Sequence, residues 1–273
     1  MTDPIARRSL LAAAAGLVAA GASSQGFAQQ HSGSEHLRAM METPPDAPTV
    51  AMLIYPRMVA LDLIGPMTVF KIMRFNVQLV WKDKAPVSTD VGLHFAADQT
   101  FEECPKDVDV LFAPGGILGT VDCMNDPEVC AFLADRGARA KWVTSVCTGG
   151  LLLAAAGLLK GYEATAHWAV ADLLPLMGAR RVDNRIVRDR NRMTGGGVTA
   201  GIDFALALAA QMEGEEAARR AQLIIEYARE PPFENGTPQE AGAARVAEMR
   251  KRRAWMDAQA RRAAQAAGAR LGV

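Results

Sequence analysis

Four short, almost continuous apolar runs alternate with more polar stretches in the middle of the chain. They span residues 50–55, 77–81, 108–113 and 142–146. A strand of a parallel sheet is covered on both faces, so its sequence is continuously apolar rather than alternating. Because segments of helical character separate these runs, we predict an α/β fold, a flavodoxin-like parallel sheet with helices on both of its faces.

Composition and charge limit the class of protein. The 273 residues are 50% hydrophobic and carry a formal net charge of zero, which suits one sizeable core and excludes a disordered chain. A balanced charge also lacks the basic surface of a nucleic-acid-binding protein. The four cysteines have no CxxC spacing, and the four histidines do not cluster with them. We therefore expect no metal site and no cofactor.

Cys147 stands between the run at 142–146 and the helix-prone segment 151–156, with Thr148-Gly149-Gly150 as the link. This order is typical of a strand, a tight turn and a helix, the geometry of a nucleophile elbow. The N-terminus of the helix favours a thiolate, and the turn is expected to push the thiol toward solvent. The alternative is a buried cysteine that fills a gap in the core. The turn favours a nucleophile.

The N-terminus has the pattern of an export signal. Arg7 and Arg8 precede an apolar stretch at 10–22, and small residues follow it. We predict that residues 1–28 are a twin-arginine signal peptide and that the polar residues 29–48 are a linker. The mature protein would be periplasmic or secreted, with no stable membrane anchor after processing. The alternative, a retained anchor helix, is disfavoured because the apolar stretch is too short to span a bilayer comfortably.

Two further segments follow predicted strands. The turn at 114–116 exposes backbone N–H groups at the carboxyl end of the sheet, where open α/β sheets bind ligands. Asp62 lies in the loop or first helical turn before Pro66, which we expect near the start of that helix. On residue type alone, helix capping and catalysis explain this carboxylate about equally well.

Three glycines at 195–197 precede an apolar helix predicted for residues 199–212. The GxGxxG spacing with a following acidic residue is missing, so we expect close packing beside Cys147 rather than a phosphate site. Asp203, inside that helix, is expected to be a structural carboxylate.

The remaining elements are less regular. His167 is expected to begin a helical stretch, and residues 181–182 and 186–188 to form an antiparallel hairpin at the sheet edge. An Ala/Arg-rich helix is predicted for residues 243–270. Its apolar residues are too sparse for a membrane-surface helix, so we assign it a tail or dimer role.

Several of these segments together resemble the isonitrile hydratases, a family within the ThiJ/PfpI superfamily of class I glutamine-amidotransferase-like folds. The similarity runs from about Val50 to Pro238. It rests on residues 61–66, 80–83, 143–149, 166–168, 194–204 and 226–228. We therefore expect that fold over residues 49–238, a helical tail over 239–273, and a homodimer.

The resemblance implies roles for the residues of the site. It makes Cys147 the nucleophile, Asp62 its acidic partner and Thr148 a supporting residue. The Gly116 and Thr148 N–H groups would polarise the intermediate. The remaining positions expected to line the oxyanion or substrate site are Gly115, His167 and Val198. For His167, a structural role is an equally good explanation.

The implied reaction is the conversion of an isonitrile and water to an N-substituted formamide through a Cys147 thioimidate, a cysteine-dependent hydro-lyase activity. Asp62 would donate the proton and then act as a base toward water, which requires a raised pKa. Ile64 and residues 117–120 depart from the family pattern, so the substrate is less determined than the nucleophile.

Other activities of the same superfamily remain open. Peptidase-like relatives carry His where this chain has Thr148, and glyoxalases or deglycases carry Glu where it has Asp62. A glyoxalase, deglycase or stress-protective protein is the stronger alternative. A transcription regulator is disfavoured because no helix-turn-helix segment follows the domain.

Overall fold

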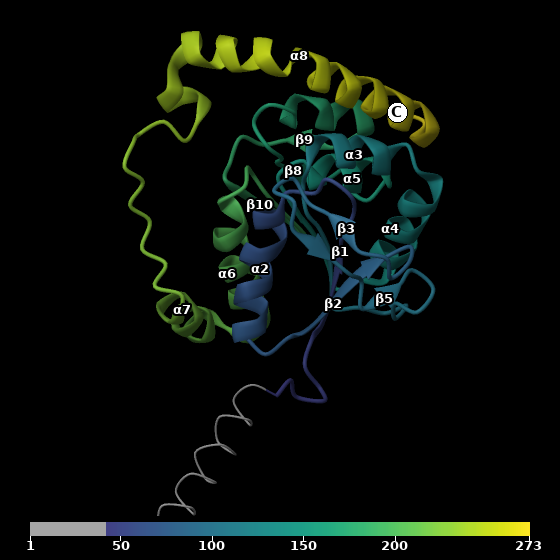
Figure 1. The fold of residues 1–273 in the computed structure, drawn as a ribbon, viewed down its shortest axis with the longest axis vertical. Coiled ribbons are helices and arrows are strands. Elements are labelled where there is room, and N and C mark those ends of the chain that lie inside the picture. Colours follow the sequence, from purple (N-terminus) through teal and green to yellow (C-terminus); the bar gives the residue numbers. More distant parts are fainter. Residues whose placement is uncertain (1–41) are drawn as a thin grey trace, which may run out of the picture. The chain divides into compact units, whose positions relative to one another are not determined.

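A seven-stranded sheet forms the centre of the molecule (Figure 1), which we describe from a computed structural model for residues 42–273. In sheet order the strands are β10 (Ile186–Asp189), β11 (Arg192–Gly195), β7 (Trp142–Val146), β6 (Val110–Ala113), β1 (Thr49–Leu53), β2 (Asn76–Trp81) and β5 (Gln99–Thr100). The pairing of β10 with β11 is antiparallel and the other pairings are parallel. The predicted α/β sheet is therefore confirmed, and the four apolar runs are its four central parallel strands.

Helices cover both faces of this sheet. The pair α2 (Ala60–Ile72) and α6 (Ala200–Glu213) packs together on one face, with α7 (Glu215–Ile224) beside it. The other face carries α3 (Ile117–Met124), α4 (Pro127–Arg139) and α5 (Gly149–Ala155). Helix α4 has a side-chain cap: Asp126 accepts the Glu128 N–H at 3.0 Å, and Pro127 is the first helical residue.

Aromatic side chains join the sheet to the α2–α6 pair. Phe204 of α6 stacks on Phe112 of β6 with ring centroids 5.7 Å apart, and it meets Phe70 of α2 edge-on at 6.4 Å. All three side chains are fully buried. Burial of large aromatic rings is a dominant source of core stability, so this cluster fastens α2 and α6 to the sheet.

The hairpin at the sheet edge differs from the prediction. Residues Arg180–Arg181 form β9, which pairs in parallel with β8 (Glu163–Ala164). The partner of β10 is instead β11, a strand that the sequence pattern missed, and Arg190 makes the turn between them with a φ of 55°. The cause is tertiary: β11 pairs along its length with β7, and this pairing sets the register of the edge.

Two helix starts also differ. Helix α2 begins at Ala60, so Asp62 lies in its first turn and Pro66 lies inside the helix rather than at its entry. Pro66 packs closely against α6, where a Cβ on Gly201 would come within 3.2 Å of its ring. Residues after His167 form a turn first, and the helical stretch is the 3₁₀ helix η1 (Ala171–Met177).

The predicted C-terminal helix is present as α8 (Pro238–Leu271), with a capping box at Thr237 and a kink at Gly242. It packs on η1, α3 and α5. The contact residues are small rather than the sparse large apolar ones: Ala260, Ala263, Ala264, Ala267 and Gly268 are buried. A Cβ on Gly268 would lie 2.1 Å from the Leu176 carbonyl oxygen, so the backbones approach closely. Within residues 42–273, no helix is long and apolar enough to cross a membrane.

Two pairs of short strands complete the description. They are β3 (Val87–Ser88) with β4 (His94–Phe95), and β8 with β9.

Candidate active site

Cys147 occupies the turn between β7 and α5, as the nucleophile-elbow prediction requires. Its φ is 57°, a left-handed conformation that non-glycine residues rarely adopt, and such strain is concentrated at functional sites. Its N–H bonds to the Gly195 and Gly196 carbonyls at 3.1 and 2.8 Å, which holds the turn. Gly149 permits the sharp approach, since a Cβ there would lie 2.2 Å from the Ala113 carbonyl oxygen.

The Cys147 thiol is buried, with 4% of the residue exposed, so the expectation that the turn would push it into solvent is wrong. Burial, and then the negative charge of Asp62, raise the pKa of the Cys147 thiol. The Thr148 N–H lowers this pKa, as expected for an amide at a helix N-terminus, but it does not overcome burial. Burial therefore opposes the formation of a free thiolate.

Asp62 lies beside this thiol, and none of its surface is exposed. Its Oδ2 accepts the Gly115 N–H at 3.0 Å, whereas its Oδ1 has no hydrogen-bond partner among the described residues. Burial raises the pKa of this carboxyl from its ordinary value of 3.8 to about 7, although the contacts with Cys147 and Gly115 oppose the rise. The capping role weighed from the sequence does not apply, because the side chain makes no cap bond in α2. Asp62 is instead suited to exchange a proton near neutral pH.

Gly115 lies where the three predicted catalytic residues meet. A Cβ on Gly115 would come within 2.7 Å of Asp62 Oδ2, of Cys147 Cβ and of the Thr148 backbone nitrogen. Only glycine leaves room for that convergence. The structure therefore brings together Asp62, Cys147 and Thr148, the three residues to which the family resemblance gives catalytic roles.

Thr148 leads into a buried hydroxyl network that sequence reasoning missed. Its Oγ1 lies 2.8 Å from Thr120 Oγ1, which lies 3.0 Å from the Tyr55 hydroxyl. Tyr55 donates to the Pro114 carbonyl at 2.8 Å. Tyr55 is the last residue of the predicted strand and Thr120 belongs to a segment without a clear helical pattern, so no local signal marks them as partners.

The same network changes the role expected for Gly116. The Gly116 N–H donates to Thr148 Oγ1 at 2.8 Å, so it is not free to polarise an intermediate. The role expected for this N–H group is therefore wrong. The Gly115 N–H is likewise taken by Asp62. The amide that acts on the reacting sulfur is that of Thr148.

His167 contacts the nucleophile through its backbone. Its N–H donates to the Cys147 carbonyl at 3.1 Å, and its Nδ1 accepts the Ala169 N–H at 3.3 Å. Burial, and then the charge of Arg253, lower the pKa of the imidazole to about 4. The side chain is therefore neutral at pH 7, and the residue supports the elbow through its backbone N–H.

A cavity of about 450 Å³ opens beside the elbow. Its wall includes His167, Gly196, Gly197 and Val198, of which Gly196 bonds to Cys147, so the cavity borders the nucleophile without containing it. This agrees with the substrate-lining role expected for His167 and Val198. A volume of this size suits a small organic molecule.

Arg253 of α8 is a second residue that sequence reasoning missed. Only 18% of its side chain is exposed; it pairs with Asp257 at 3.1 Å, and its Nε has no hydrogen-bond partner among the described residues. Its positive charge lowers the pKa of both Cys147 and His167. The Ala/Arg-rich pattern of α8 shows many arginines but does not indicate which one faces the site.

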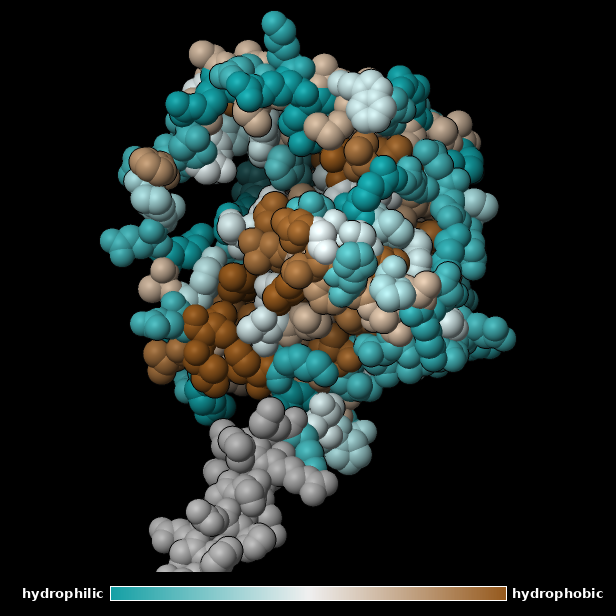
Figure 2. All heavy atoms as spheres, in the orientation of Figure 1, coloured by the Kyte–Doolittle hydropathy of each residue, from teal (hydrophilic) through white to brown (hydrophobic). Residues whose placement is uncertain are grey.

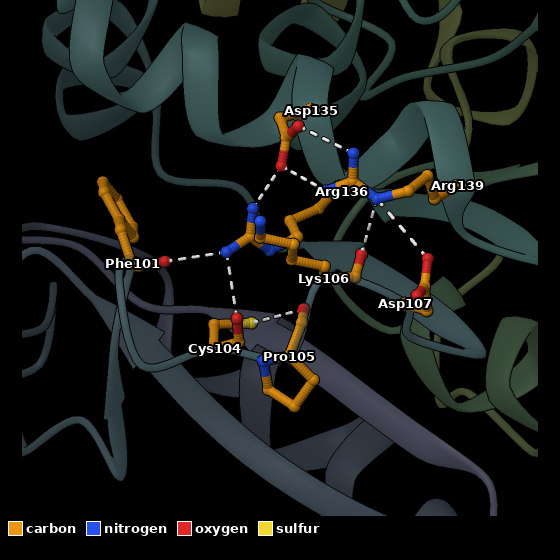
Figure 3. Close-up of polar contacts among 8 residues, drawn as sticks. All are labelled: Phe101, Cys104, Pro105, Lys106, Asp107, Asp135, Arg136 and Arg139. Carbon is orange, nitrogen blue, oxygen red and sulfur yellow. Dashed lines mark hydrogen bonds and ion pairs between the residues drawn. The ribbon is translucent and has the colours of Figure 1, made fainter.

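Another cluster of polar groups is structural (Figure 3). Arg136 of α4 donates to the Phe101 and Cys104 carbonyls at 3.0 and 2.9 Å. The Cys104 thiol donates to the Pro105 carbonyl at 3.7 Å, and burial raises its pKa. These bonds tie the loop after β5 to α4. Asp203 is also structural, as predicted: it accepts from Arg185 at 2.6 Å and from Tyr227 at 3.1 Å.

No set of three or more metal-ligating side chains occurs within the described residues.

Comparison with known proteins gives concordant matches. The model of the DJ-1/PfpI family matches residues 48–211. The chain is 48% identical over 206 residues to isonitrile hydratase from Pseudomonas putida. This alignment covers 75% of this chain and 90% of that protein. It is 28% identical over 133 residues to a deglycase from Pyrococcus furiosus, covering 48% of this chain and 78% of the relative.

A solved structure shares the architecture. The crystal structure of a ThiJ/PfpI family protein from Pseudomonas syringae superposes with a TM-score of 0.77 and 45% identity, and the match covers 82% of this chain and 96% of that one. The family match spans the sheet from β1 to β11 and includes the elbow. On this fold, this site and these matches, the chain belongs to the DJ-1/PfpI family.

Proposed function

We propose that the protein is an isonitrile hydratase, which adds water to R–N≡C and releases an N-substituted formamide. The observation that carries this proposal is the buried pair of Cys147 and Asp62. It places a nucleophile beside a carboxyl whose pKa is raised to about 7 and whose Oδ1 has no partner in the described chain. A relative that is 48% identical bears the name of this activity.

The first half of the reaction uses the one proton that the pair retains. Burial disfavours two negative charges side by side, so Cys147 and Asp62 together keep a proton at neutral pH. The sulfur attacks the terminal carbon of the isonitrile, and Asp62 delivers the proton to that carbon. The product is the thioimidate R–N=CH–S–Cys147, and Asp62 is left as a carboxylate.

The second half uses that carboxylate as a base. Asp62 takes a proton from water as the hydroxyl oxygen adds to the thioimidate carbon, and it passes this proton to the nitrogen. Collapse of the resulting R–NH–CH(OH)–S–Cys147 expels the sulfur, and the proton of the hydroxyl group returns to the pair of Cys147 and Asp62. The formamide R–NH–CHO leaves, and the net change is the addition of one water to one isonitrile.

The alternative is a glyoxalase- or deglycase-like activity, which the similarity to the deglycase from Pyrococcus furiosus supports. The purified mature protein should be incubated with a small isonitrile and, separately, with methylglyoxal. Formamide formation, followed by NMR, supports the hydratase. Conversion of methylglyoxal to lactate with no reaction of the isonitrile would assign the alternative.

We also propose that the protein is exported by the twin-arginine route, on the basis of Arg7-Arg8 and the apolar stretch after it. The predicted signal lies outside the described residues. Expressed in a bacterium with this export pathway, the mature protein should begin near Gln29, as N-terminal sequencing would show. The control replaces both arginines by lysine, Arg7→Lys with Arg8→Lys, and should block processing. An intact Met1 of the wild-type protein in the soluble cytoplasmic fraction would contradict export.

A homodimer is the third element of the proposal. Exposed apolar residues gather over α2, α6 and α7 (Figure 2), among them Leu61, Leu223 and Ile224, which are 45%, 80% and 67% exposed. Large apolar surface patches usually mark protein–protein contacts. The wild type should have the mass of a dimer in light scattering, and Leu223→Glu combined with Ile224→Glu should shift it to a monomer. A monomeric wild type at micromolar concentration would disprove this.

A further inference from the structure

Three arginines line the cavity beside Cys147, and two of them already have carboxylate partners. Arg181 pairs with Asp183 at 2.7 Å, and Arg185 pairs with Asp203 at 2.6 Å. The third, Arg250, has no ion pair with a described residue. The cavity therefore carries an uncompensated positive charge on its α8 side.

Arg250 keeps most of its hydrogen-bonding capacity. One Nη donates to the Ala169 carbonyl at 3.3 Å, and the guanidinium lies over the Trp168 ring at 5.4 Å from its centroid. Stacking on an aromatic face fixes the plane of a guanidinium. The N–H groups along its edge remain available to bind a ligand. Those donors have no partner in the described chain.

The helix that carries Arg250 is fastened to the domain. In addition to the packing of the buried alanines of α8, Arg261 pairs with Asp172 at 3.0 Å and Arg270 donates to the Met124 carbonyl at 3.0 Å. Arg253 lies one helical turn after Arg250 on the same side, since residues three apart are neighbours on a helix. The helix thus presents two cations toward the site, Arg250 at the cavity and Arg253 behind it.

We propose that the cavity selects isonitriles whose substituent carries a carboxylate, which Arg250 binds while the isocyano group reaches Cys147. This inference rests on the proposed function and names its substrate class. An arginine and a carboxylate form paired, charge-assisted hydrogen bonds, and a partly enclosed cavity strengthens them. The isocyano group is a linear two-atom rod, so it forms the narrow end of such a substrate.

A matched pair of substrates tests the selection: 4-isocyanobenzoate and 4-isocyanobenzamide, which differ in charge and little in size. The kcat/KM for the carboxylate should be about 10- to 100-fold higher, the usual effect of one charge-assisted contact. The preference should appear mainly in KM and should shrink as salt is added. Arg250→Gln should reduce the carboxylate's kcat/KM by at least ~10-fold more than the amide's.

Arg252→Gln is the matched control, because Arg252 lies on the same helix, is 70% exposed and pairs with Glu248 at 2.7 Å. It should leave the kcat/KM of both substrates unchanged. Hydration of both substrates without a preference for the carboxylate, or an equal loss for both in Arg250→Gln, would overturn the inference while the proposed function stood.

A binding measurement separates the inference from the activity. The Cys147→Ala variant should bind the product 4-formamidobenzoate at least ~10-fold more tightly than 4-formamidobenzamide in calorimetry. Equal affinities would reject the anion site. Failure of the wild type to hydrate either isonitrile would instead reject the hydratase assignment, and the calorimetry alone would then decide whether the cavity takes an anion.

Discussion

Replacement of Cys147 by alanine should reduce isonitrile hydration by at least ~1,000-fold, the scale on which enzymes lose activity with their nucleophile. The fold should survive, because alanine keeps a Cβ at the left-handed φ of 57° and adds no atom to the turn. Formamide production by NMR measures the activity, and thermal unfolding by circular dichroism measures the fold. Cys147→Ser, which retains a hydroxyl of lower nucleophilicity, should be nearly as inactive.

The control is Cys130→Ala. Cys130 is partly buried at the start of α4, where its thiol bonds to the Cys123 carbonyl at 3.6 Å, and it has no part in the site. Its loss should leave turnover close to that of the wild type. If Cys147→Ala remains active and Cys130→Ala does not, covalent catalysis by Cys147 is wrong.

Asp62→Asn is expected to lower turnover by at least ~100-fold, because the amide keeps the size of the side chain but cannot deliver or accept the proton. Intact-protein mass spectrometry of the variant after long exposure to an isonitrile should show a covalent adduct on Cys147, because the thiol's own proton can still reach the carbon slowly, whereas the water has lost its base. A variant with full turnover and no adduct would remove Asp62 from the mechanism.

The raised pKa of Asp62 adds a pH test of the same variant. The pKa of the Asp62 carboxyl is about 7 in the folded protein and 3.8, its ordinary value, in the unfolded chain. Folded protein therefore binds more protons between these values, and the stability from this group is lost as the pH rises through about 7. The wild type should lose more thermal stability than Asp62→Asn between pH 4 and 8. Parallel profiles would mean that Asp62 ionises normally.

Local sequence determined the main elements of this protein. The runs that became β1, β6 and β7 are largely apolar because both of their faces are covered, and that pattern is visible without any tertiary information. The elbow was equally local: a strand, Cys147 and a glycine-rich helix start are consecutive in the chain. Asp62 drew attention by its position before the helix interior, although the family resemblance was needed to choose catalysis over capping.

Contacts between segments that lie far apart in the sequence could not be predicted from local patterns. The sequence around β10 suggested the wrong hairpin partner, because the choice between residues 181–182 and β11 depends on which segment also pairs with β7. The small residues of α8 gave no conspicuous apolar stripe, since close backbone approach, rather than large side chains, joins it to η1.

The sequence by itself thus determined the α/β class, the elbow and the identity of the candidate nucleophile, because each depends on residues that are neighbours in the chain. Only the tertiary structure decided that Cys147 is buried, that the Gly116 N–H is taken by Thr148, and that Arg250 and Arg253 approach the site. Solvent exposure, hydrogen-bond partners and electric fields are set by atoms that lie many residues apart along the chain, and local patterns carry no information about which of those atoms meet.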